Sequence, residues 1–247
     1  CPGSQTTLAQ LGCHELTLPA HRIPTRMFKD PDTGGYLPYH TYKRKKAGVD
    51  AATQLDSEDE YEYVEDRDST EGAIYPISRG HIANMEAFLA FLDHVHSLLT
   101  TSYHNTPIVL VASPQWTRPD HETVARFIFE KTKTPALCLL HNAFAAQYGL
   151  KWTNLTVVDI GYEKVDVTCL WDSNVVAHKH IDDRVSGGEF FTQKLLALLK
   201  DKAGFTYDMA EQLKKSPLCE VLPYAANMES LMELPDDDVA SATANAE

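Results

Sequence analysis

The sequence lacks the features that mark membrane and secreted proteins. It has no run of roughly 18 consecutive apolar residues, the length needed to span a bilayer. It also has no basic start followed by an apolar stretch, so we expect no secretory leader and no membrane partner. An initiator methionine is missing too, and we therefore expect the numbering to begin inside a longer natural chain.

Paired cysteines are also missing. The five cysteines form no Cys-x-x-Cys pair, and their odd number fits neither a zinc site nor a disulfide framework. Cysteines without such pairing are typical of a reducing compartment, the cytosol or the nucleus.

Basic residues are too few for a nucleic-acid-binding surface. The net charge is −13, and binding to DNA requires a basic face that displaces counterions. We therefore expect no direct nucleic-acid binding, whether sequence-specific or not.

The negative charge is concentrated in one segment. Residues 56–71 hold nine acidic residues and one base, Arg67, and a basic cluster at residues 43–46 precedes them. We expect residues 30–72 to form an extended, poorly ordered insertion. The two charged clusters either bind partners or are solvated loops, and we favour solvated loops.

Hydrophobic periodicity predicts alternating strands and helices. The continuous apolar runs at residues 107–112 and 155–159 predict strands that are buried on both faces. Strands, helices and a hairpin in this order indicate an α/β domain with a mixed sheet. The remaining expected elements are strand-like alternation over 5–28, an amphipathic helix over 85–99, a helix from Pro119, a helix over 134–149, a hairpin over 164–177 and a helix opened by Gly187 and Gly188.

Two segments resemble actin. Residues 129–136 read FEKTKTPA and are similar to the actin segment FETFNTPA, and residues 74–80 read IYPISRG and are similar to LKYPIEHG. Asp159 and Gly161 form an Asp-x-Gly turn before the predicted hairpin, as in the actin, Hsp70 and sugar kinase superfamily, where such turns hold nucleotide phosphates. The resemblance implies an actin-like (ribonuclease H-like) ATPase fold of the α/β class with a mixed five-stranded sheet.

The resemblance also implies a division of the chain. Residues 1–150 correspond to the first actin-like half, with the acidic insertion at about 30–72. Residues 151–234 correspond to the start of the second half, and residues 235–247 are expected to be a disordered acidic tail.

Two further segments resemble a narrower group, the fungal actin-related protein 9 family. They are residues 4–10, SQTTLAQ, and residues 213–222, LKKSPLCEVL. This resemblance implies a structural subunit of the nuclear SWI/SNF and RSC chromatin remodellers. The partners it implies are a second actin-related protein, an amphipathic helix of the motor subunit and a small accessory subunit.

The first phosphate loop of actin, DNGSG, corresponds here to degenerate residues. Cys1 replaces the carboxylate, Pro2 lacks an N–H, and Gln5 replaces the last glycine, so only Gly3 and Ser4 match. The lysine that follows in actin is Leu8. A phosphate cradle needs small residues and a cation, and this loop lacks both at key positions.

The second phosphate loop of actin, DSGDG, is similarly altered. Asp159 and Gly161 match, whereas Tyr162 and Glu163 replace the second Asp-Gly, and Glu163 is expected to set a negative charge where phosphate would bind. The glutamine that positions water in actin falls at Asn142, and a histidine of the second loop falls at Asp166. We expect no catalytic residues, no metal and no ATP cofactor.

Two alternatives remain open at this stage. The chain is a working nucleotide-binding ATPase or kinase of the same superfamily, or it is a filament-forming actin. His178 and His180 are expected to share one face of a strand, where an ordinary structural role is favoured over a metal site.

Overall fold

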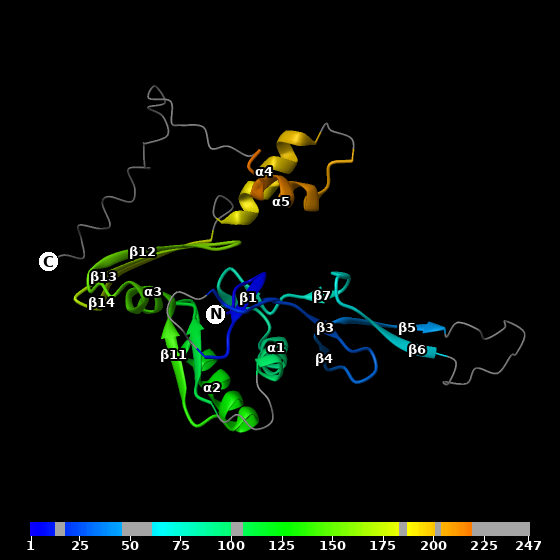
Figure 1. The fold of residues 1–247 in the computed structure, drawn as a ribbon, viewed down its shortest axis with the longest axis horizontal. Coiled ribbons are helices and arrows are strands. Elements are labelled where there is room, and N and C mark those ends of the chain that lie inside the picture. Colours follow the sequence, from blue (N-terminus) through cyan, green and yellow to red (C-terminus); the bar gives the residue numbers. More distant parts are fainter. Residues whose placement is uncertain (13–17, 46–60, 100–105, 183–186, 201–203, 219–247) are drawn as a thin grey trace, which may run out of the picture. The chain divides into compact units, whose positions relative to one another are not determined.

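The computed structural model describes residues 1–12, 18–45, 61–99, 106–182, 187–200 and 204–218, and it confirms the α/β class (Figure 1). The chain forms two compact units, Cys1–Phe191 and Thr192–Glu247. The expected boundary between residues 150 and 151 follows the two halves of actin and stays a prediction, as does the tail at 235–247, which lies outside the described residues.

The first unit begins with short antiparallel strands. The strand-like alternation expected over residues 5–28 is confirmed at β1, β2 and β3, whereas residues 13–17 lie outside the described residues. Strands β1 and β2 form a hairpin, and β3 pairs with both β4 and β7. A tight β8–β9 hairpin comes next, and Arg79 and Gly80 in its turn both have positive φ. The bounds are β1 Thr6–Ala9, β2 His21–Pro24, β3 Met27–Lys29, β4 Tyr36–Leu37, β7 Ala73–Ile74, β8 Ile77–Ser78 and β9 His81–Ile82.

The described part of the acidic insertion is more ordered than expected. Within it, β5 (His40–Lys45) and β6 (Tyr61–Asp66) form an antiparallel hairpin whose strands run side by side in Figure 1. The expectation of a poorly ordered segment over 30–72 is therefore wrong for these strands. Opposite charges face each other across the ladder, because an Arg44 guanidinium nitrogen lies 3.1 Å from Glu62 Oε1. Opposite charges at facing positions stabilise an antiparallel hairpin, whereas like charges there would destabilise it.

The core of the first unit lies around α1 (Met85–Leu99) and α2 (Arg118–Thr132). Phe88 is fully buried, and its ring meets that of Trp116 edge to face with centroids 5.4 Å apart. The predicted start of α2 is confirmed, since Thr117 and Asp120 form a capping box at that end and Pro119 occupies the first turn.

The helix predicted over residues 134–149 is wrong in its first half. Residues Leu137–His141 form β11, which pairs in parallel with β10 (Ile108–Ala112), and only Asn142–Leu150 form a helix, α3. The non-local pairing outweighs the local periodicity because the parallel ladder with β10 stabilises β11 as a strand. The His141 side chain then accepts from the Ala143 N–H and caps α3.

The predicted strand and hairpin at residues 155–177 are confirmed as one antiparallel sheet. It consists of β12 (Leu155–Ile160), β13 (Val165–Trp171) and β14 (Asn174–Ile181). Burial on both faces is wrong, however. Val158 is 55% exposed, and Val109 in β10 is 58% exposed, so described residues cover only one face of each strand.

The expected single five-stranded sheet is not formed by the described residues. Their ladders join two or three strands each, both parallel and antiparallel, so the mixed character holds while the number does not. None of the helices in the described ranges combines the length and the apolar composition that crossing a membrane requires.

The second unit holds most of α4 (Gly188–Leu199) and all of α5 (Tyr207–Lys215). Within it, the Glu211 carboxylate accepts hydrogen bonds from Thr192, Lys214 and Lys215. Burial of Glu211 raises its pKa, but these hydrogen bonds outweigh burial and lower the pKa to about 2. The carboxylate therefore ties α4 to α5 while it is ionised.

Candidate functional site

A pocket of about 160 Å³ in the first unit brings together the two loops that the sequence resemblance paired. The N-terminal turn, the end of β10 and the turn after β12 all contribute to it. Five of the seven predicted loop residues line this pocket: Gly3, Ser4, Asp159, Gly161 and Tyr162. Four further positions compared with actin also line it, namely Cys1, Pro2, Leu8 and Asn142, whereas Asp166 does not.

Gln5 and Glu163 are not among the residues that line the pocket. The Gln5 carbonyl accepts from the Thr25 N–H at 2.9 Å, which joins the first loop to the segment after β2. The Glu163 carboxylate accepts from the Ser78 hydroxyl at 3.2 Å and from the Arg79 N–H at 3.3 Å. The negative charge of Glu163 is therefore bound at the β8–β9 turn.

One backbone N–H group of each loop donates to a carbonyl oxygen of the protein. The Gly3 N–H donates to the Thr6 carbonyl at 3.2 Å, and the Gly161 N–H donates to the Lys164 carbonyl at 2.8 Å. Phosphate-binding loops work by pointing such N–H groups at the ligand. At Gly3 and Gly161 the groups are instead directed at carbonyl oxygens of the same loop.

The turn after β12 is fixed against the start of α4. The Gly188 N–H donates to the Gly161 carbonyl at 2.9 Å, and the Glu189 N–H donates to the Tyr162 carbonyl at 2.8 Å. The backbone comes this close only because Gly187 has no side chain, since a Cβ there would lie 2.4 Å from the Tyr162 carbonyl oxygen.

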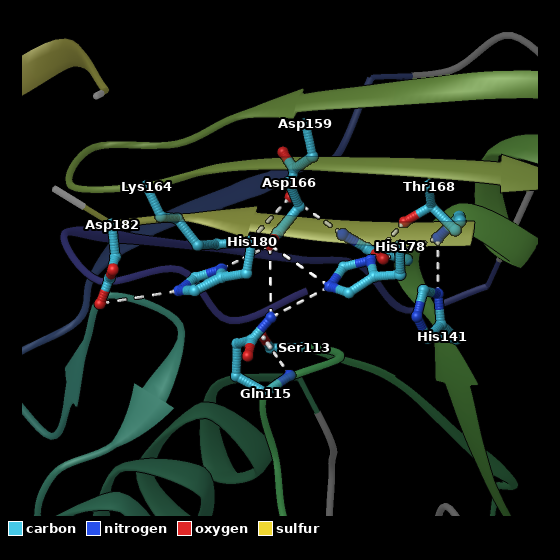
Figure 2. A network of polar contacts seen from close by, with 12 residues as sticks. Ser113, Gln115, His141, Asp159, Lys164, Asp166, Thr168, His178, His180 and Asp182 are labelled. Atoms are coloured by element: carbon cyan, nitrogen blue, oxygen red, sulfur yellow. Dashed lines mark hydrogen bonds and ion pairs between the residues drawn. The ribbon is translucent and has the colours of Figure 1, made fainter. Parts of the chain in front are cut away.

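Lys164 is a pocket residue that the sequence reasoning missed. Its ammonium lies 3.2 Å from Asp159 Oδ2 and also contacts Asp166 Oδ2 (Figure 2). The side chain of Lys164 is only 12% exposed. A signal was present in the sequence, because Lys164 and Asp166 are two residues apart in a predicted strand and so share one face.

Asp166 is the centre of a buried polar network. Its carboxylate is 1% exposed, and Oδ1 accepts from His180 Nδ1 at 2.6 Å and from Gln115 Nε2 at 3.3 Å (Figure 2). His178 lies beside His180 on the same face, as predicted, and its Nε2 is 3.8 Å from Asp166 Oδ1. In the part of the chain that the structure describes, no group of three or more His, Cys, Asp or Glu residues is placed to hold a metal ion.

Acid is expected to weaken the fold through Asp166. Burial raises the pKa of Asp166, but hydrogen bonds from Lys164 and His180 outweigh burial and hold this pKa below its usual value of 3.8. The folded pKa is depressed, so the stabilisation is complete above the unfolded value and is lost as the pH falls through the folded value. Urea unfolding from about pH 7 to pH 3 should therefore show a steeper loss of stability in the wild type than in Asp166→Asn. Parallel curves for the two proteins would contradict this role of the carboxylate.

The fold and the paired loops define an actin-like protein, and the comparison with protein families agrees. The actin family model matches residues 19–227, so the chain belongs to the actin family. The actin-like resemblance found in the sequence is thereby confirmed. The first loop, at residues 1–5, lies before the matched range.

Two relatives are similar in sequence. The SWI/SNF and RSC complexes subunit arp9 of Schizosaccharomyces pombe is 30% identical over an alignment of 176 residues, which covers 64% of this chain and 34% of that protein. Actin-related protein 4 of Arabidopsis thaliana is 28% identical over 128 residues, which are 51% of this chain and 29% of that protein. The matched residues thus make up about a third of each relative's length.

Solved structures show the same fold. The crystal structure of MreB5 of Spiroplasma citri bound to AMPPNP has a TM-score of 0.59 at 16% identity and covers 90% of this chain and 62% of that one. The ADP-bound form of the same protein gives a TM-score of 0.59 and covers 91% of this chain. At this identity the likeness shows the fold alone.

Proposed function

We propose that this chain belongs to a non-catalytic, actin-related structural subunit of a nuclear ATP-dependent chromatin-remodelling complex. The assembly role is supported by the likeness to the SWI/SNF and RSC complexes subunit arp9, at 30% identity over 176 residues. The proposal that the subunit is non-catalytic rests on one observation. Hydrogen-bond donors and carboxylates that line the pocket are already paired with each other, as Asn142 and Lys164 are with Asp159. The nuclear location follows from the same likeness.

Hydrolysis of ATP needs a held metal, oriented phosphates and a positioned water. The Gly3 and Gly161 N–H groups are directed at backbone carbonyls, so they are not oriented toward a phosphate. Asn142, at the position that orients water in actin, donates its amide to Asp159 Oδ2 at 3.0 Å. The group compared with the water-positioning glutamine therefore holds a carboxylate, which supports the proposal that this pocket does not position a water for in-line attack.

The proposed partners are a second actin-related protein, an amphipathic helix of the motor subunit and a small accessory subunit. A rigid actin-like surface offers a large area on which the apolar face of such a helix is buried. These partners are proposals for the whole protein, because the part matched here makes up about a third of the length of its relatives.

Co-expression with a motor-subunit helix and a second actin-related protein tests the assembly role. We expect the three chains to co-purify, and a helix with its apolar face replaced by charged residues to be lost from the complex. A monomer that ignores both partners would contradict the proposal.

A parallel thermal-shift measurement with Mg-ATP separates this proposal from the alternative of a nucleotide-binding ATPase or kinase. The fold neighbours bound to AMPPNP and ADP motivate that alternative. A ligand present at about 100 times its dissociation constant adds about 2.7 kcal/mol of stability. We expect Mg-ATP to leave Tm unchanged and no phosphate to be released. A rise in Tm together with phosphate release would favour the enzyme.

A further inference from the structure

We infer that the ammonium of Lys164 is the resident cation of the pocket and takes the place that a divalent metal ion would need. The inference rests on the proposed non-catalytic function and names the residue that closes the site to a metal–nucleotide complex. Lys164 has this role because three independent features of the first unit converge on it.

The first feature is the strand register. Asp159 in β12 and Asp166 in β13 are directly opposite each other in the antiparallel ladder. Like charges at opposite positions destabilise a sheet, since the two side chains lie on one face and close together. Two carboxylates in this arrangement require a cation between them or the loss of one charge.

The second feature is the way the carboxylates are satisfied. Lys164 reaches both of them, at 3.2 Å from Asp159 Oδ2 and in direct contact with Asp166 Oδ2. Gln115 and His180 donate to the other oxygen of Asp166 (Figure 2). A metal ion would have to displace the ammonium and compete with these hydrogen-bond donors for the carboxylate oxygens.

The third feature is the space reserved for the Lys164 side chain. A Cβ on Gly80 would lie 3.0 Å from Lys164 Cδ and 2.9 Å from the Ser113 hydroxyl oxygen. A Cβ on Gly161 would lie 3.2 Å from Lys164 Cγ. Two glycines from different turns therefore leave room for the aliphatic part of Lys164. The lysine side chain packs closely against the backbone of both turns.

Removal of the ammonium should convert the pair of carboxylates into a metal site. Lys164→Met keeps an unbranched side chain as far as Cε and removes the ammonium, and Lys131→Met, on the exposed face of α2, is the matched control. We expect Lys164→Met to lower Tm on the order of 10 °C, because it leaves two buried or half-buried carboxylates without a counter-ion. Mn²⁺ should then raise Tm by about 5 °C or more and give an electron paramagnetic resonance signal for about one bound ion.

The wild type and Lys131→Met should show neither the loss nor the binding of Mn²⁺. Binding of Mn²⁺ to the wild type with the same affinity as to Lys164→Met would overturn the inference, and so would a folded Lys164→Met that neither loses stability nor binds the ion. Neither result touches co-purification with the partners, so failure of this inference is distinguishable from failure of the proposed function.

A measurement on the wild type keeps the test decisive if Lys164→Met does not fold. Acetylation of lysines followed by mass spectrometry should modify Lys164 at least ~10-fold more slowly than Lys131, because the amine must first leave two carboxylates. Equal rates of modification would overturn the inference.

Discussion

Replacing Gly187 by alanine is expected to destabilise the protein by about 2–5 kcal/mol. The added Cβ would lie 2.4 Å from the Tyr162 carbonyl oxygen and 2.9 Å from the backbone nitrogen of Lys164, and φ at this position is +87°. The backbone must therefore move, and the hydrogen bonds from Gly188 and Glu189 to the turn after β12 are lost with it. Urea unfolding of both proteins at neutral pH measures the difference in free energy.

Gly34→Ala is the matched control for this substitution. Gly34 also has positive φ, +71°, but no atom lies within 4 Å of the position of its Cβ. It should cost only the conformational strain, about 1–2 kcal/mol. Equal losses for the two variants would show that the contact with Tyr162 contributes nothing.

Phe88→Ala is expected to cost about 3–5 kcal/mol. Phe88 is 0% exposed at the centre of the core formed by α1 and α2, and its ring lies edge to face against Trp116. The substitution removes buried apolar area and leaves a cavity that the surrounding helices fill only in part. Chemical denaturation followed by Trp fluorescence measures the loss and also reports on Trp116.

Phe129→Ala provides the comparison within α2. Phe129 is 48% exposed, so its removal should change the free energy of unfolding far less than that of Phe88. If Phe129→Ala lowers the free energy of unfolding as much as Phe88→Ala does, the core does not lie around the buried face of α1.

Elements with a strong local pattern were predictable from the sequence. Helix α1 repeats its apolar residues at helical spacing, and the hairpin of β13 and β14 alternates around a turn at residues 172–174. The strand β11 is not predictable from its own residues, because a short apolar run such as LCLLH fits a helix as well as a strand. Its pairing with β10, which is distant in the sequence, makes it a strand. The β5–β6 hairpin was missed because composition alone does not show which charges face each other.

The candidate site was predictable as a pair of loops but not as a set of contacts. Asp159 and Gly161 line one pocket with Gly3 and Ser4, so the comparison of turns with actin pairs loops that the fold brings together. The direction of Glu163 depends on the β8–β9 turn, which lies more than eighty residues earlier in the chain. The comparison with actin does not predict Lys164, because the lysine that follows the first loop of actin corresponds to Leu8 in this chain.

The Glu163 carboxylate accepts hydrogen bonds from Ser78 and Arg79 and so joins the turn after β12 to the β8–β9 turn. A carboxylate that belongs to the chain is present at a fixed effective concentration, whereas a free ligand must be supplied by the solution. It is neither diluted, exchanged nor consumed. The contact that it makes between the two turns is therefore built from the chain's own atoms.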